Sequence, residues 1–80
     1  MDRGELLKQL NEVFIDTFDD TEIQINDTTV ASDIANWDSL NHIPLIVAIE
    51  RHFKIRFTAR EIQTFNNVGE MLDCIQSKRA

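Results

Sequence analysis

The chain has 80 residues, of which 42% are hydrophobic and 28% charged, with two glycines and one proline. These values argue against disorder and against a turn-rich β fold, so we expect one helical domain over residues 1–80. Fourteen acidic against eight basic residues give a net charge of -6, which speaks against general nucleic-acid binding, because that needs a basic face. There is no apolar run near the ~20 residues that span a membrane, no signal peptide and no cysteine pair, so we expect a cytoplasmic protein.

The charges are distributed unevenly along the chain. The first 38 residues contain ten acidic and two basic residues, whereas residues 39–80 contain four acidic and six basic ones. A solvated polar surface explains most of this pattern, but the asymmetry could also orient a partner through long-range electrostatic steering.

The first predicted element is an amphipathic helix over residues 3–18. Its apolar residues recur at steps of three and four: Leu6, Leu7, Leu10, Val13, Phe14 and Phe18. Residues 21–38 show no such period, so we expect a long loop whose scattered apolar residues hold it against the core. A strand over residues 22–25 is the alternative for the start of that segment.

A central helix is predicted to follow Asp38, with Ser39 as its N-cap. The apolar residues after this point cover more than one helix face: Leu40, Ile43, Leu45, Ile46, Val47, Ala48, Ile49 and Phe53. Pro44 falls inside the segment, so we expect either a local bend or a helix that begins one turn later.

Two capping patterns predict the remaining helices. Thr58 followed by Glu61 is the pattern of a capping box and predicts a short helix that ends near residue 63 or 64. Asn67 with Glu70 repeats the pattern before an apolar stripe that ends near Ser77. We therefore expect an all-α fold, a small four-helix bundle with three long helices, one short helix and a long loop between the first and second helices.

Residues that could carry catalysis or bind a metal are sparse. His42 and His52 are ten positions apart and Cys74 is alone, so the sequence offers no metal-ligand set. A catalytic triad could be assembled by residue type from Asp38, Ser39 and His42. The sequence contains neither an oxyanion loop nor a nucleophile elbow, so we do not expect a hydrolase site. Cys74 is expected beside the last apolar stripe as a small buried hydrophobe rather than a reactive thiol. We therefore expect a protein that is not an enzyme.

Ser39 is the residue that points to a function. It ends an acidic loop, so its hydroxyl should be exposed, and it lies where the free N–H groups and dipole of a helix N-terminus favour a phosphate. The segment W-D-S-L-N-H over residues 37–42, followed by an apolar helix and Glu50, resembles the prosthetic-group site of acyl and peptidyl carrier proteins. The resemblance extends to the first helix, the long loop, the short third helix and the V-G-E-M-L segment of the last helix.

This resemblance implies a covalent cofactor and a set of partners. A phosphopantetheinyl transferase would attach 4'-phosphopantetheine from coenzyme A to Ser39, and Asp38 would help to dock that enzyme or its metal ion. The arm would hold an acyl or aminoacyl cargo as a thioester, loaded by a ligase and passed to downstream transferases or synthases. Tethering would raise the effective concentration of the cargo at each partner. A monomer is expected for such a shuttle.

The resemblance places partner contacts on the second helix, at Leu40, Ile43, Val47 and Glu50. Membership of the core is the alternative explanation for the three apolar residues, and the favoured one for Ile43.

The second helix departs from the carriers of fatty acid synthesis. Pro44 and Arg51 stand where those carriers commonly have acidic residues, which argues against the main carrier of fatty acid synthesis. The segment W-D-S-L-N-H looks more like stand-alone carriers of specialised pathways, including aminoacyl, polyketide or cell-envelope modification systems. We expect partner binding to lose less affinity with added salt than for an acidic carrier. The alternative function is a small helical protein-interaction module in which Ser39 is only a helix N-cap.

Overall fold

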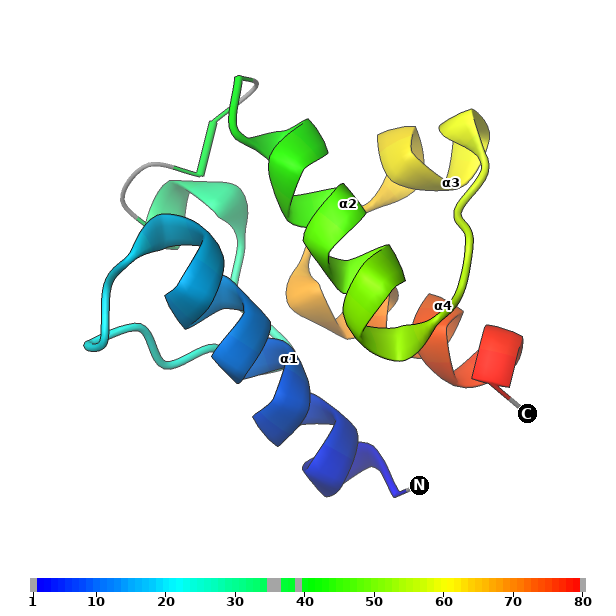
Figure 1. Cartoon of the computed structure of the whole chain (residues 1–80), viewed down its shortest axis with the longest axis horizontal. Helices are drawn as coiled ribbons and strands as arrows, with labels where there is room; N and C mark the ends of the chain where they lie inside the picture. Colours follow the sequence, from blue (N-terminus) through cyan, green and yellow to red (C-terminus); the bar gives the residue numbers. More distant parts are fainter. Residues whose placement is uncertain (1, 35–36, 39, 80) are drawn as a thin grey trace.

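The computed structural model describes residues 2–34, 37–38 and 40–79, and all regular structure within these ranges is helical. The helices are α1 (Arg3–Phe18), α2 (His42–Phe53), α3 (Ala59–Thr64) and α4 (Val68–Arg79), with a 3-10 turn, Ala31–Asp33, between α1 and α2. Helix α1 packs against α2 and α4, and the short α3 lies on the far side of α2 from α1 (Figure 1). The predicted bundle of three long helices and one short helix is confirmed. Residues 22–25, all of which the structure describes, form no strand.

The core lies where α1, α2 and α4 face one another. Its buried residues are Leu6, Leu10, Val13 and Phe14 from α1, Leu45, Ile46, Ile49 and Phe53 from α2, and Val68, Met71, Leu72 and Ile75 from α4. The long loop adds Ile23, Ile25 and Trp37, which confirms that its apolar residues hold it on the core. Trp37 meets Phe14 edge-on, with ring centroids 5.1 Å apart, a favoured aromatic geometry.

The start of α2 differs from the prediction. The helix begins at His42 with Asn41 as its N-cap, so the prediction of Ser39 as the N-cap is wrong. Pro44 is the third residue of α2, where a missing N–H costs no bond, because first-turn amides have no partner within their own helix. Of the two outcomes expected for Pro44, the later start is therefore the one observed.

The side chain of Asn11 fixes the first part of the loop to α1. Its amide nitrogen donates to the carbonyl oxygen of Ile23 at 3.2 Å, and its carbonyl oxygen accepts the N–H of Ile25 at 2.8 Å. Asn11 thereby satisfies two half-buried backbone groups in a segment that has no ladder partner of its own.

We expect Asn11→Ala to lower the free energy of unfolding by about 1–2 kcal/mol, because both loop groups lose their partners. Urea unfolding followed by circular dichroism measures this change. Lys8→Ala is the control, since Lys8 is exposed on the same helix and should change stability by no more than about 0.5 kcal/mol. Equal losses in the two variants would contradict the assigned role of Asn11.

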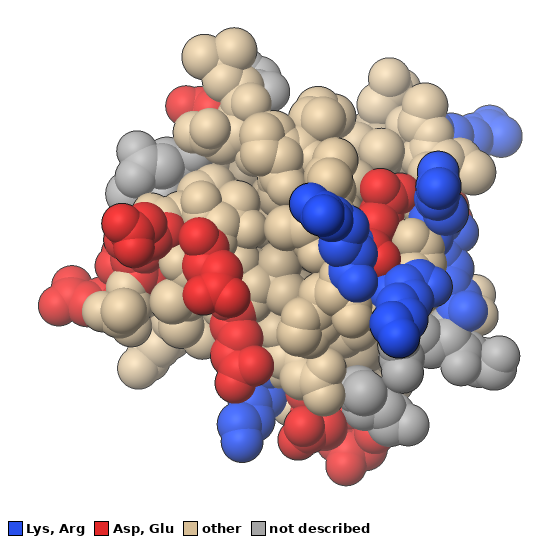
Figure 2. Space-filling model, viewed as in Figure 1, with Lys and Arg blue, Asp and Glu red and all other residues tan. Residues whose placement is uncertain are grey.

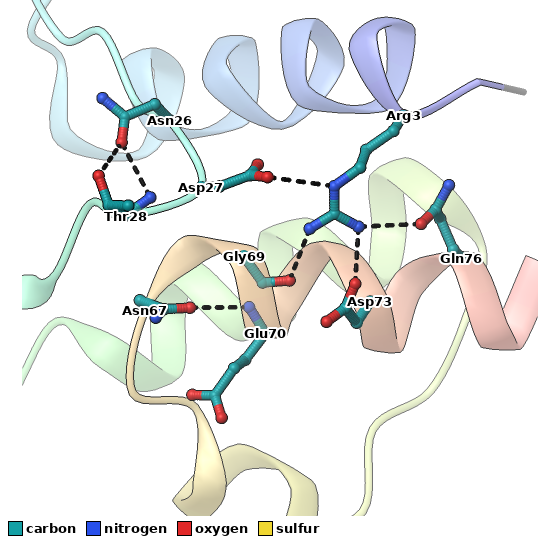
Figure 3. Close-up of polar contacts among 9 residues, drawn as sticks. All are labelled: Arg3, Asn26, Asp27, Thr28, Asn67, Gly69, Glu70, Asp73 and Gln76. Carbon is teal, nitrogen blue, oxygen red and sulfur yellow. Dashed lines mark hydrogen bonds and ion pairs between the residues drawn. The ribbon is translucent and has the colours of Figure 1, made fainter.

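Arg3 joins the beginning of α1 to the loop and to α4. Its guanidinium donates to Asp73 at 2.7 Å, to Gln76 at 3.0 Å and to the carbonyl oxygen of Gly69 at 3.2 Å. It also lies 3.4 Å from a carboxylate oxygen of Asp27 (Figure 3). The hydrogen bond to Asp73 is the main reason that the pKa of Arg3 is raised above its ordinary value. This arrangement fixes the segment that precedes the candidate site against the end of the bundle.

Candidate functional site

The predicted attachment point lies at the entrance to α2. Ser39 is outside the described residues, but its neighbours Asp38 and Leu40 are both exposed, and Leu40 keeps 84% of its surface in contact with solvent. The segment that leads into α2 runs along the periphery of the molecule (Figure 1). The surface on both sides of position 39 is therefore open to a partner.

Asp38 organises the turn before α2. One carboxylate oxygen accepts the N–H groups of Leu40 and Asn41, each at 3.0 Å, and its backbone carbonyl accepts the N–H of His42 at 2.9 Å. The expectation that the amides at this point are free to hold a phosphate is therefore wrong, because the carboxylate and the backbone carbonyl of Asp38 already accept them. The carboxylate also lies at the positive end of the helix dipole of α2, which stabilises a negative charge.

His42 is a structural link rather than a catalytic base. The indole N–H of Trp37 donates to Nδ1 of His42 at 3.1 Å, and the two rings are stacked with centroids 6.2 Å apart. Nε2 lies 3.4 Å from the carbonyl oxygen of Ile62, so the neutral tautomer with its proton on Nε2 satisfies both contacts. With both ring nitrogens used, His42 connects the loop to α3 and offers no acceptor to a nearby hydroxyl.

A shallow groove begins beside Asp38 and runs between α2 and α3. It has a volume of about 380 Å³, and its lining is mostly apolar, with Trp37, Ile43, Ile62 and Phe65 among the contributors. No sequence pattern predicts this groove, because its walls combine the loop and the start of α2 with α3, which is distant in the chain.

An exposed apolar row leads away from position 39 along α2. Leu40, Ile43 and Val47 are 84%, 55% and 43% exposed. Ile43 and Val47 are four residues apart and so share one face of α2, and Leu40 lies in the turn just before the helix. The preference for Ile43 as a core residue is therefore wrong, because the core face of α2 belongs to other residues. Exposed large apolar side chains arranged contiguously are typical of interaction surfaces.

Glu50 has a structural role. Its half-buried carboxylate accepts the backbone N–H of Phe57 at 2.8 Å and so closes the connection between α2 and α3. Its expected role as a partner contact stays a prediction.

Cys74 and Glu61 connect α4 to α3. The Cys74 thiol donates to Glu61 at 3.4 Å, and Lys78 lies 2.9 Å from the other carboxylate oxygen. Partial burial, followed by the contact with Glu61, raises the pKa of Cys74 to about 11. The pKa of Glu61 is lowered to about 2, mainly by the hydrogen bond from the backbone N–H of Thr58 and, second, by the contact with Lys78. Cys74 packs against the core as expected, although it is half-buried rather than buried.

Metal and membrane features are both missing from the described parts of the chain. Among these residues, no group of three or more His, Cys, Asp or Glu side chains could hold a metal ion. Likewise, none of the described helices has the length and apolar character needed to cross a membrane.

The fold and the site define a small helical domain that presents one open point of its surface, followed by an apolar helix face, to other molecules. Residues 8–75 match the family described as the phosphopantetheine attachment site, and the chain belongs to this family, that of the acyl carrier proteins. The resemblance found in the sequence is thereby confirmed. The family consists of non-catalytic carriers with covalently attached 4'-phosphopantetheine.

Individual relatives agree with this assignment. The chain is 30% identical over 81 residues to an acyl carrier protein of Thermosynechococcus vestitus, an alignment that covers 100% of this chain and 99% of the relative. It is 29% identical over 80 residues to an acyl carrier protein of Coprothermobacter proteolyticus, with 96% and 94% covered. The solution structure of holo acyl carrier protein from Geobacter metallireducens is similar at a TM-score of 0.84 and 43% identity, covering 90% of this chain and 83% of that chain.

Proposed function

We propose that Ser39 bears the 4'-phosphopantetheine arm and that the chain shuttles an acyl or aminoacyl cargo between partner enzymes. The observation that carries the proposal is the open surface on both sides of this serine, with exposed Asp38 before it and exposed Leu40 after it. An arm attached between these residues displaces no buried side chain of either neighbour. The match of residues 8–75 to the family supports the identity of the group.

The residues around position 39 would each contribute to carrying the arm. When bound, the arm supplies a thiol whose acyl thioester is activated, because a thiolate leaves readily. Asp38 holds the turn in place through two amides and presents its exposed carboxylate to a phosphopantetheinyl transferase or to that enzyme's metal ion. The mostly apolar groove beside Asp38 gives the arm and an apolar cargo a surface on which to lie.

Partner enzymes would contact the apolar row of Leu40, Ile43 and Val47. Its position next to Ser39 means that any enzyme that reaches the thioester also meets this row. We further propose a stand-alone carrier of a specialised pathway, because Pro44 and Arg51 replace the acidic residues common in carriers of fatty acid synthesis. A loading ligase and downstream transferases or synthases would then be the partners.

Intact mass spectrometry tests the attachment site. Incubation of the purified chain with coenzyme A and a broad-specificity phosphopantetheinyl transferase should add the mass of one phosphopantetheine unit. Ser39→Ala should abolish the gain, whereas Ser32→Ala, at an exposed serine of the same loop, should leave it unchanged. An unchanged mass with several transferases that load a control carrier, or a gain that survives in Ser39→Ala, would overturn the proposal and favour a helical interaction module.

A further inference from the structure

Three exposed basic residues gather at the C-terminal end of α2 and in the segment after it. Arg51, Lys54 and Arg56 line a hollow of about 720 Å³, together with Val47, Glu50 and Ile55. We call Arg51, Lys54 and Arg56 the basic surface. Lysine and arginine side chains concentrate over this end of α2 and the segment that leads to α3, whereas acidic side chains gather over α1 and the neighbouring loop (Figure 2).

The basic surface is not neutralised from within the fold. Among the described residues, none of its three members forms an ion pair, whereas Arg3 and Lys78 both do. Glu50 is the one acidic residue among the described residues that line the hollow, and its single negative charge offsets only part of the three positive charges there. The positive charge is therefore available to a partner.

The basic surface continues the apolar row along the same side of α2. Ile43, Val47 and Arg51 follow one another at steps of four, which places them on one face of α2. Leu40 lies just before the helix, and Lys54 is at its C-cap. A molecule that lies along α2 meets the apolar side chains first and then Arg51, which lies about 12 Å beyond Ile43 at a rise of about 1.5 Å per residue. The two surfaces form one continuous contact area.

The charge distribution favours a protein over an extended polyanion. The chain has a net charge of -6, and ten of its acids lie in the first 38 residues, so a nucleic acid or an anionic membrane that extends from the basic surface over α1 meets repulsion there. A partner with a local acidic patch needs to match only the basic surface, because at physiological salt charges farther away than about 8 Å are largely screened.

We propose that carboxylates of a partner protein dock on Arg51, Lys54 and Arg56 while its apolar residues meet Leu40, Ile43 and Val47. The inference rests on the proposed function only in taking that partner to be an enzyme of the carrier's pathway. It gives α2 the opposite charge preference to an acidic carrier helix. Binding should then weaken with added salt through the basic residues, and this replaces the weak salt dependence expected from the missing acidic residues alone.

Titration of the uniformly 15N-labelled, unmodified chain with short poly-L-glutamate tests the docking surface by NMR. At low salt the amide shifts should concentrate between residues 47 and 56, and about 0.3 M salt should weaken binding strongly. Arg51→Gln should weaken binding about two- to fivefold, and the triple variant with Lys54→Gln and Arg56→Gln about tenfold or more. Well-dispersed spectra of the variants establish that they fold.

Lys8→Gln is the matched control, because it changes the net charge by the same amount at an exposed residue of α1 and should leave binding unchanged. Absent binding, shifts spread over the whole chain, or an equal effect of Lys8→Gln would overturn the proposal. Tighter binding to phosphatidylglycerol vesicles than to poly-L-glutamate would assign the basic surface to lipid headgroups instead. None of these readouts needs the arm on Ser39, so loss of the attachment site leaves them unchanged.

Discussion

Gly69→Ala should lower the free energy of unfolding by about 1–3 kcal/mol, a large part of the ~3–5 kcal/mol expected of a domain this small. The N–H of Gly69 donates to the carbonyl oxygen of Asp27 at 2.9 Å, and an added Cβ would lie 2.7 Å from that same oxygen. The backbone there has little room to move, because Val68 donates to Thr29 at 2.8 Å and Arg3 contacts the Asp27 carboxylate. Either the hydrogen bond to Asp27 breaks or the loop shifts.

Gly4→Ala is the matched control for this substitution. A Cβ at Gly4 would meet only the flexible side chain of Asp2, at 3.4 Å. Alanine has the higher helix propensity, so this variant should gain up to about 1 kcal/mol. Chemical denaturation of both variants should therefore separate them by about 1–4 kcal/mol. Two variants of equal stability would show that the loop accommodates the added methyl group.

The helix boundaries that depend on local chemistry could be predicted from the sequence. The predicted bounds of α1 match those observed, and the capping box of α3 is present, with Thr58 and Glu61 bonded to each other's backbone N–H at 2.8 and 3.1 Å. At α4, the side chain of Asn67 accepts the N–H of Glu70 as expected (Figure 3). The carboxylate of Glu70, however, accepts the N–H of Asn66 rather than that of Asn67. Such contacts span three or four residues, so a short sequence window contains both partners.

The beginning and the faces of α2 could not be predicted in the same way. Asp38, Ser39 and Asn41 are all residue types that favour an N-cap, and only the placement of Pro44 in the first turn separates them, because proline is tolerated there. The helix is apolar on several faces, so its periodicity does not distinguish core from surface. Ile43 is exposed because α2 has neighbours on only part of its circumference.

Contacts between distant segments had no signal in the sequence. Asn11 binds the loop, Arg3 joins α1 to α4, and Glu50 closes a connection seven residues away. From the sequence alone, each of these residues is expected to be an ordinary polar residue on a solvated helix face. Their roles follow from packing, which brings unsatisfied backbone groups within reach of a side chain that happens to be near.

The chemistry of Cys74 bears on the function of the chain as a carrier. A carrier holds its cargo on the thiol of the prosthetic arm, and a second reactive thiol in the protein would accept acyl groups at the wrong sulfur. Burial and the Glu61 carboxylate raise the pKa of Cys74 to about 11, which keeps this thiol protonated at neutral pH. The thiol of the prosthetic arm is thus expected to be more reactive than the thiol of Cys74.

Alkylation of the unmodified chain by iodoacetamide should therefore be slow at pH 7.5 and should keep accelerating up to pH about 11. Relative to a free cysteine, a rise of about two pKa units leaves about a hundredfold less thiolate, and the greater nucleophilicity of a more basic thiolate recovers about tenfold, so the net rate is about tenfold lower. Ser77→Cys combined with Cys74→Ala places the control thiol at an exposed position of the same helix, where the rate should level off near pH 9. If the rate at Cys74 levelled off at the same pH as the control, Glu61 and partial burial would not protect this sulfur, and the chain would carry a second site open to acylation.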